Sequence, residues 1–298
     1  MIDTIRALWP HTVAAGVIMA PPNGWESTSF TRAGFSSRNC FGSSQGFRLT
    51  HHATGLSASG SGHQIRSVQF SLPNVLFGSN GQLIKSQAEI DQAMARAAEL
   101  LTQVGQPVGV ISHYSRVDLC WQFALDPELA ILAHRHARHP RIRSNAGRYE
   151  GQSLFWAGSG LRVRMYDKEL EMIRRRGNIL RVEFQLQNRL LEDLMPAGEP
   201  RLNRLDFNRA YRVFRELMLG FEPNHVPEIS DISELLAIAE AAGCRYGGLS
   251  LFDIWARGKN PQHVHRVQRE IATLRPRLFG VEWSTLLPAD GPPEVVEL

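Results

Sequence analysis

Three segments in the middle of the chain alternate strictly between apolar and polar residues: Val117–Phe123, Leu161–Lys168 and Leu180–Gln187. Successive side chains of a β-strand point to opposite faces, so a period of two predicts a strand with one buried face. Such strands are typical of antiparallel sheets. We therefore predict an antiparallel sheet whose polar face gathers Arg, Asp, Glu, Tyr and Lys side chains.

Apolar residues at helical spacing predict helices around these strands. One helix is expected over Ser86–Val104, and a second should begin with Asp126 as its cap, continue through Pro127 and end near Ala137. After about residue 200 the pattern predicts four further helices, over Leu202–Leu219, Ser233–Ala242, Leu249–Arg257 and Pro261–Leu274. The last two, joined by a turn at residues 258–260, look like a helix-turn-helix pair.

The first 70 residues are rich in Gly, Ser and aromatic residues and have little helical periodicity. Short strands and loops are expected there, with a flexible segment at Gly55–Gly62. The apolar stretch Val13–Ala20 follows the acidic Asp3, which does not suit a signal peptide, so we predict a strand. Together the patterns predict an α+β domain over residues 1–200, with a sheet flanked by helices, and a helical domain over residues 201–298.

Composition narrows the expected setting of the protein. No apolar run reaches the roughly 18 residues that a membrane helix needs. Cys40, Cys120 and Cys244 lie far apart and form no CxxC pair. This spacing favours a reducing compartment over a disulfide framework or a zinc site. We therefore expect a cytoplasmic protein without a membrane partner.

The net charge of +4 is unevenly distributed. Residues 134–189 contain 13 Lys and Arg against 5 Asp and Glu, whereas residues 1–133 are neutral and residues 190–298 are acidic. The planar guanidinium group suits phosphate oxygens, and 30 of the 33 basic residues are Arg. A block of Arg in a neutral frame indicates a polyanionic partner. Residues 256–277 carry 6 basic residues and 1 acidic residue, which suits a helix on a phosphate backbone.

The predicted polar face places one tyrosine among cations and carboxylates: Tyr166, Arg162, Arg164, Lys168, Asp118 and Glu183. A phenol that attacks a phosphodiester needs cationic neighbours or a metal ion, because its ordinary pKa is about 10. A divalent cation held by carboxylates would also neutralise the phosphate. The same residues fit a tyrosine at a sheet edge with two carboxylates in surface ion pairs, and spacing alone leaves both interpretations open.

Histidines and arginines follow the second predicted helix. A metal-binding pair of histidines is disfavoured there, because an Arg stands between His134 and His136 and positions two apart diverge on a helix. We instead predict a basic helix end and loop that contacts phosphates. Its members are His134, His136, Arg138, Arg141 and Arg143.

Three motifs occur together in a fixed order: Ser115-Arg-Val-Asp118, Arg162-Val-Arg-Met-Tyr166-Asp-Lys168 and Leu180-Arg-Val-Glu183. They resemble the motifs of the rolling-circle replication initiators of filamentous phages, the gene II/X protein family, and of related plasmid initiators of the Rep_trans type. Ser71–Gly78 and Gly248–Arg257 resemble further segments of that family, so the likeness extends over about residues 70–275.

The resemblance implies a metal-dependent endonuclease that nicks and joins one strand of its origin DNA. Tyr166 would be the nucleophile and form a 5′-phosphotyrosyl link, helped by Arg164 and Lys168. Asp118 and Glu183 would hold Mg²⁺ or Mn²⁺. The freed 3′-OH would prime rolling-circle replication by a host polymerase and helicase in the bacterial cytoplasm, and a homo-oligomer is left open.

We expect two sets of arginines to contact the DNA. The first lies near the cut in the single strand and the second on the last long helix, against the duplex origin. They are Arg116 and Arg162 in the first set, and Arg266 and Arg269 in the second.

The chain departs from the plasmid branch at Gln122 and Gln185, where that branch often has further acids. A metal ion would then need other ligands, such as His113, Glu169 or solvent. Tyr114 and Tyr149 are the candidates for a second catalytic tyrosine. Two alternatives stay open: a relaxase or transposase with the same tyrosine chemistry, and a replication regulator that binds DNA without cutting it.

Overall fold

The structure is a computed structural model. Its described backbone covers residues 1–9, 11–14, 25–32, 35–42, 47–52, 62–103, 106–107, 110–134, 137–142, 148–150, 153–173, 177–221, 236, 245–246, 249–278 and 283–293. Side chains are described for most residues of 1–9, 67–103, 110–142, 153–173, 177–221, 252–271 and 283–293.

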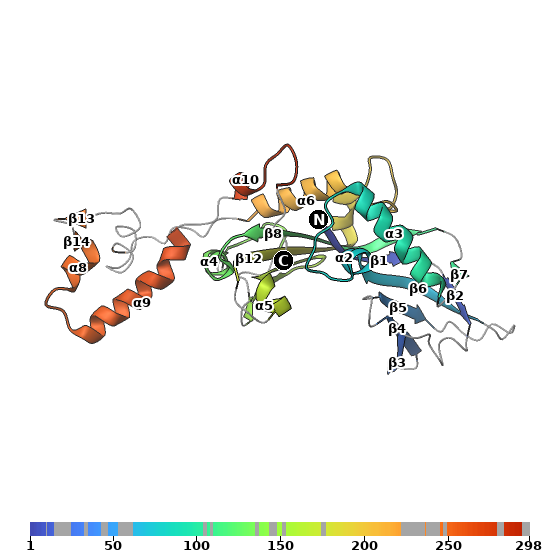
Figure 1. Cartoon of the computed structure of the whole chain (residues 1–298), viewed down its shortest axis with the longest axis horizontal. Coiled ribbons are helices and arrows are strands. Elements are labelled where there is room, and N and C mark those ends of the chain that lie inside the picture. Colours follow the sequence, from blue (N-terminus) through green and yellow to red (C-terminus); the bar gives the residue numbers. More distant parts are fainter. Residues whose placement is uncertain are drawn as a thin grey trace.

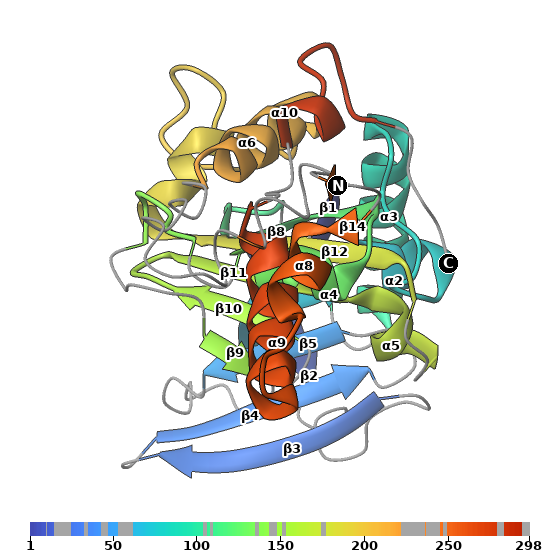
Figure 2. The same ribbon diagram turned by 90° about the vertical axis from the view of Figure 1, so that its left-hand side faces the viewer.

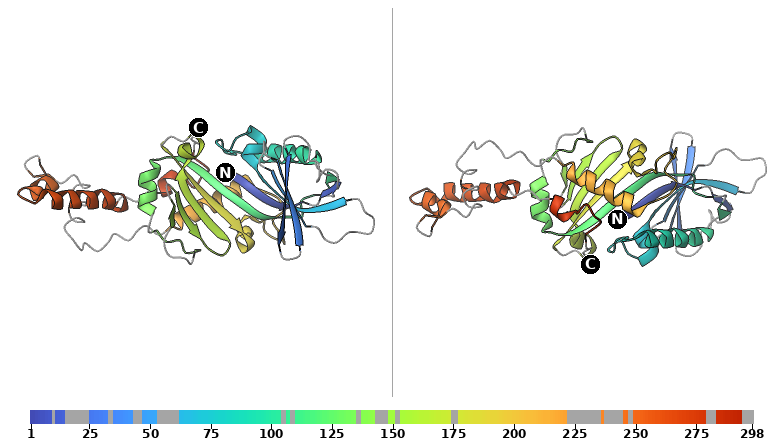
Figure 3. Two further views of the ribbon diagram at one scale, coloured as in Figure 1. Left: turned by 90° about the horizontal axis from the view of Figure 1, so that it is seen from below. Right: turned by 90° about the horizontal axis from the view of Figure 1, so that it is seen from above.

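One large antiparallel sheet organises the molecule, which confirms the predicted α+β class (Figure 1). Its strands run in the order β3-β4-β5-β6-β1-β8-β12-β11-β10-β9, and β2 pairs with both β6 and β7. The strands are β1 (Ile2–Leu8), β2 (His11–Ala14), β3 (Trp25–Arg32), β4 (Phe35–Gly42), β5 (Phe47–His52), β6 (Gly62–Ser71), β7 (Gln106–Pro107), β8 (His113–Ala124), β9 (Arg148–Glu150), β10 (Ser153–Ala157), β11 (Leu161–Asp167) and β12 (Ile179–Gln187). Strands β3 to β5 run crosswise to β8, β11 and β12, so the sheet twists strongly along its length (Figure 3).

The three strands predicted from alternation are β8, β12 and β11, side by side at the centre of this sheet. Their apolar side chains form the core on one face, and their polar side chains share the other. One boundary differs from the prediction, because β11 ends at Asp167 and Lys168 begins a helix. The Asp167 carboxylate accepts the backbone N–H of Leu170 at 3.0 Å, which stabilises a helix start at this point.

The helices are α2 (Leu72–Phe77), α3 (Gln87–Thr102), α4 (Pro127–His134), α5 (Lys168–Ile173), the 3₁₀ helix η1 (Asn188–Leu194), α6 (Phe207–Leu219), α8 (Leu251–Ala256), α9 (Pro261–Leu278) and α10 (Trp283–Leu286). Helix α3 confirms the helix expected over Ser86–Val104, with Ser86 as its cap. Helix α4 begins at Pro127 as predicted but ends earlier, at His134.

Helix α6 covers the apolar face of the sheet, and α10 lies against α6 (Figure 2). Phe214 of α6 meets Phe184 of β12 edge to face, with ring centroids 5.3 Å apart. Residues of α6 and α10 therefore belong to the same core as the strands, including Phe207, Phe214 and Trp283. The predicted boundary at residue 200 assigned α6 to the C-terminal domain, whereas the structure packs it on the sheet.

Helices α8 and α9 project from this body (Figure 1). They have a small core of their own, in which Phe252 and Trp255 pack against Val267 and Ile271. Helix α9 contacts α4 of the main body. The helical hairpin predicted near the C-terminus is therefore present, and β13 (Arg245–Tyr246) pairs with β14 (Leu249–Ser250) just before it.

Two predicted segments fall largely outside the described residues: the flexible Gly55–Gly62 and, apart from position 236, the helix over Ser233–Ala242. Of the predicted strand Val13–Ala20, only the first two residues are described, at the end of β2. Among the described helices, none combines the length and the apolar character needed to cross a membrane.

Candidate active site on the polar face of the sheet

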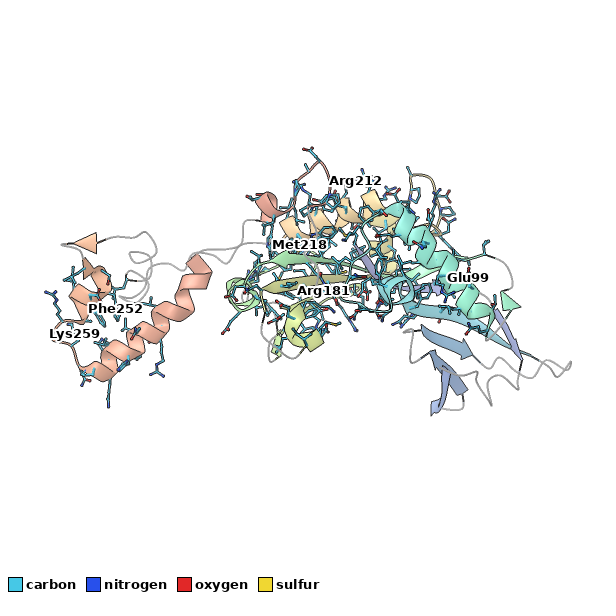
Figure 4. All side chains as sticks on the ribbon, in the orientation of Figure 1. Glu99, Arg181, Arg212, Met218, Phe252 and Lys259 are labelled. Carbon is cyan, nitrogen blue, oxygen red and sulfur yellow. The ribbon has the colours of Figure 1, made fainter. Side chains whose placement is uncertain are left out.

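Four neighbouring strands contribute charged side chains to one cluster on the polar face. The cluster comprises Asp3 of β1, Asp118 of β8, Arg181 and Glu183 of β12, and Tyr166 of β11. The register explains why they meet: Glu183 stands opposite Cys120 on β8 and opposite Arg164 on β11. Figure 4 shows Arg181 in the middle of the main body, on β12.

Tyr166 is held by hydrogen bonding and by a cation. Its hydroxyl donates to Glu183 Oε1 at 2.6 Å. The guanidinium carbon of Arg164 lies 4.0 Å from the centre of the ring. The side chain is almost wholly covered, with 3% of its surface exposed. Burial raises the pKa of Tyr166 well above its ordinary value, and the charge of Glu183 adds to that rise although Arg181 opposes it.

Two cations and a carboxylate border the tyrosine. Lys168 Nζ donates to Glu171 at 2.8 Å and to Asn80 Oδ1 at 3.3 Å. Arg164 donates to the other oxygen of Glu171 at 3.3 Å. Burial lowers the pKa of Lys168, and Arg181 lowers it further. Burial alone would raise the pKa of Glu171, but its hydrogen bond to Lys168 prevails and the pKa is lowered.

Arg181 occupies the centre of the cluster and has no exposed surface. One terminal nitrogen lies 3.1 Å from Asp3 Oδ2 and donates to Cys120 Sγ at 3.3 Å; the other donates to the Asn80 carbonyl at 2.7 Å. Its Nε lies 3.0 Å from Glu183 Oε1, an ion-pair contact without the direction of a hydrogen bond. Asp3 also accepts a hydrogen bond from Ser71.

Asp118 forms a forked ion pair with Arg116, whose Nε donates to Oδ1 at 2.7 Å and whose terminal nitrogen donates to Oδ2. Burial raises the pKa of Asp118 to about 6, although Arg116 opposes this rise. Asp118, the predicted metal ligand, and Arg116, the predicted DNA contact, are therefore both on the polar face. They bind each other, which leaves few lone pairs of Asp118 for another partner.

The residues present do not fit the predicted metal site. Arg116 engages Asp118, and Arg181 together with the Tyr166 hydroxyl engages Glu183. In the described part of the chain, no three His, Cys, Asp or Glu side chains come together as a ligand set. The suggested extra ligand Glu169 instead accepts the backbone N–H of Asn178.

The residues of the basic helix end that was predicted to contact phosphates differ in their exposure. Arg138 and Arg141 are both exposed, and Arg141 pairs with Asp193. Arg162 is exposed on β11. His136 and Arg143 lie outside the described residues.

His134 corrects the prediction made for it, because its side chain is in the core. Its Nδ1 lies 2.8 Å from the Ala130 carbonyl, and its Nε2 accepts the indole N–H of Trp283 at 2.9 Å. Both ring nitrogens are thus occupied, so His134 cannot bind a phosphate. Trp283 of α10 and Phe221, both far from His134 in sequence, pack against its ring, and burial lowers the pKa of His134.

Arg266 and Arg269 are both exposed on α9, as duplex contacts would require. Arg266 lies 2.9 Å from His263 Nδ1 and 3.7 Å from Glu270. Lys259, in the turn between α8 and α9, is also exposed (Figure 4). Contact of these residues with DNA stays a prediction.

Of the two further tyrosines considered, Tyr149 is in β9 and its side chain is not described. Tyr114 is 5% exposed, and burial raises its pKa. With His113, Asn188 and Arg201, it lines a cavity of about 370 Å³ at the far end of β8. His113 therefore lies in this cavity, apart from the cluster around Arg181.

Sequence reasoning missed Asp3 as a member of the cluster and Asn80 and Glu171 as its neighbours, and it placed Arg181 on the polar face without giving it a role. Alternation along β12 placed Arg181 on the polar face beside Glu183, so its presence could have been found. Asn80 and Asp3 come from a loop and from the first strand, and no local pattern links them to β12.

Searches against family models and against curated proteins found no match. Among solved structures, the chain is similar to the rolling circle replication initiator protein from Geobacillus stearothermophilus. The alignment covers 79% of this chain and 91% of that one, with 10% sequence identity and a TM-score of 0.36. A likeness of this degree identifies neither the family nor the activity of this chain.

Proposed function

We propose that the protein is a rolling-circle replication initiator that nicks single-stranded origin DNA with Tyr166. The observation that carries this proposal is the hydrogen bond from the Tyr166 hydroxyl to Glu183. The cations Arg164 and Lys168 lie beside the tyrosine ring. A phenol paired with a carboxylate has an acceptor for its proton, and adjacent cations favour a phosphate beside it.

In the proposed step, the Tyr166 oxygen attacks the scissile phosphorus as its proton leaves. A phosphorus–oxygen bond to the phenol forms, and the bond to the 3′ oxygen breaks. The 3′ oxygen takes a proton from solvent and becomes the free 3′-OH primer. The 5′ phosphate stays on the tyrosine, and Arg164 and Lys168 would stabilise the charge on its oxygens.

Arg164 is suited to receive that phosphate. Its Nε is buried and has no hydrogen-bond partner among the described residues. Its terminal nitrogen contacts Glu171 at 3.3 Å, and 36% of its side chain is exposed. A phosphate would replace Glu171 as the partner of Arg164 and gain the unused donor, because guanidinium groups bind phosphate oxygens in pairs. Moving Arg164 off the ring would also uncover the tyrosine.

The partners proposed for this function are single-stranded and duplex origin DNA, with a host polymerase and helicase to continue synthesis. Exposed basic residues on α9 would bind the duplex, and Arg162 and Arg138 would lie along the single strand. Dependence on Mg²⁺ or Mn²⁺ stays a prediction, and nothing in the step above is assigned to the ion.

The decisive test is a covalent adduct. A randomised pool of single-stranded DNA, labelled at the 3′ end, is incubated with the protein with and without Mn²⁺. An adduct that resists SDS is expected, and sequencing of the trapped DNA gives the cleaved site. Tyr166→Phe should lose the adduct entirely while its thermal unfolding and its DNA affinity change little, because only the phenolic oxygen is removed. An adduct that persists in Tyr166→Phe would show that the nucleophile is elsewhere.

One observation favours a second candidate, a replication regulator that binds DNA without cutting it. With 3% of its surface exposed, Tyr166 is as covered as a core residue. Such a regulator would bind duplex DNA through α9 and give no adduct under any condition. The adduct assay therefore separates the two functions directly.

A further inference from the structure

The contacts of Glu183 differ from those expected of a metal ligand. One oxygen, Oε1, accepts the Tyr166 hydroxyl at 2.6 Å and lies 3.0 Å from Arg181 Nε. The first distance is at the short end for O–H···O hydrogen bonds. This oxygen of Glu183 is therefore already engaged by a hydroxyl and by one of the protein's own cations.

We propose that Glu183 is the general base that accepts the Tyr166 proton, and that Arg181 and Asp3 are positioning residues that hold it in place. This inference rests on the proposed nicking function. The proton moves from the phenol to Glu183 as the phenolic oxygen bonds to phosphorus, and it returns to solvent after the 3′ oxygen has left. No metal ion is needed to orient Glu183.

Arg181 is well suited to this positioning role. A guanidinium group remains protonated in proteins, so its charge beside Glu183 is permanent. Its other nitrogens are fixed by Asp3 at 3.1 Å and by the Asn80 carbonyl at 2.7 Å, so the side chain cannot swing away without breaking both contacts. This series of side-chain contacts, Asp3–Arg181–Glu183–Tyr166, thus crosses the sheet from β1 to β11.

Proton acceptance also depends on the other charges around Glu183. The charged groups around it come from five elements of the fold: Arg181 on β12, Arg164 on β11, Arg116 and Asp118 on β8, Lys168 and Glu171 on α5, and Asp3 on β1. Each carboxylate of this set is itself paired with one of the cations: Asp118 with Arg116, Asp3 with Arg181, and Glu171 with Lys168 and Arg164. The alternative is that these ion pairs only stabilise the fold.

A first experiment needs no activity. With 3-fluorotyrosine in place of Tyr166, the ¹⁹F resonance reports on the hydroxyl. We expect Glu183→Gln to shift this resonance and to lower the pKa of the phenol, since the neighbouring negative charge is lost. Added Mn²⁺ should not broaden the resonance. Broadening by Mn²⁺ that disappears in Glu183→Gln would overturn the proposal in favour of a metal ligand.

A second experiment uses the DNA site selected in the adduct assay. Glu183→Gln should slow adduct formation in a single turnover by about 10²–10⁴-fold, the usual contribution of a general base. A fluorinated tyrosine with a more acidic phenol at position 166 should restore much of that rate, because a weaker base then suffices. Glu183→Asp should keep part of the activity, and the same-face control Gln185→Ala should be close to wild type.

The outcomes distinguish the two proposals. No rescue by the acidic tyrosine, with unfolding and DNA affinity unchanged, would overturn the role of Glu183 and leave the nicking function standing. Absence of any adduct from the unaltered protein would overturn the nicking function and, with it, the role of Glu183 as a base. The ¹⁹F measurement would then still show whether the hydrogen bond exists.

Discussion

Replacing Arg181 by methionine should destabilise the fold strongly. The guanidinium has no exposed surface and lies within 3.1 Å of both Asp3 and Glu183. Methionine fills a similar volume but leaves these carboxylates without their cation. Removing one partner of a buried ion pair costs about 3–5 kcal/mol. Because the Glu183 side chain is 22% exposed and water can partly solvate it, we expect about 3 kcal/mol, mostly from Asp3.

Urea denaturation followed by tryptophan fluorescence measures this loss. Arg96→Met is the matched control, since Arg96 pairs with Glu99 at 2.9 Å but is 53% exposed, and such surface pairs contribute less than about 1 kcal/mol. Adding Asp3→Asn to Arg181→Met should recover part of the stability. If Arg181→Met unfolds at the same free energy as Arg96→Met, the carboxylates are solvated and the argument for a buried network is refuted.

Three further predictions concern pH and salt. Asp118→Asn should gain on the order of 1–2 kcal/mol above about pH 6 relative to acid conditions, because burial raises the pKa of Asp118 to about 6 and its ionisation destabilises the fold as pH rises from about 4; denaturation at acid and neutral pH that gives equal changes would contradict this. Replacing Arg266 and Arg269 together should weaken duplex binding several-fold and lower the salt slope by about two units, without slowing single-strand nicking; an unchanged slope would mean that they contact no phosphate. The contribution of His134 to stability should fall as pH drops below about 6.5, because burial lowers the pKa of His134 and only the unfolded chain then takes up the proton; His134→Gln should remove this contribution relative to the unaltered protein, and near-ultraviolet dichroism should follow the contact with Trp283.

Much of the sheet could be predicted from the sequence, because alternation is a local property. Strands β8, β11 and β12 follow directly from it, and so does the sharing of one face by Tyr166 and Glu183. The pairing within that face depends on distant residues. Asn80 arrives from the loop after α2 and accepts Arg181 through its carbonyl, which a pattern of side chains does not reveal.

Burial was the property that sequence reasoning judged least well. His134 stands in a basic segment and suggested a surface, yet α10 covers it from a position far along the chain. Tyr166 stands on a strand face that reads as polar, yet Arg164 and the start of α5 close over it. Trp283 is far from His134 in sequence, so no local pattern could identify it. Arg164 and Lys168 are only two positions from Tyr166, but the burial depends on the strand ending at Asp167, which alternation did not predict.

His134 has a consequence for the architecture beyond its protonation. Its ring lies 5.8 Å from that of Phe221 and 5.3 Å from that of Trp283, centre to centre. Phe221 and Trp283 thus lie against one ring of the main body, and the described helices α8 and α9 between them in sequence form an insertion with adjacent ends. A short glycine–serine linker could replace residues 222–282 and leave the sheet, α6 and α10 folded. Under the proposed function, the same junction would let another DNA-binding module be exchanged for α8 and α9, so that target choice and strand chemistry could change independently of each other.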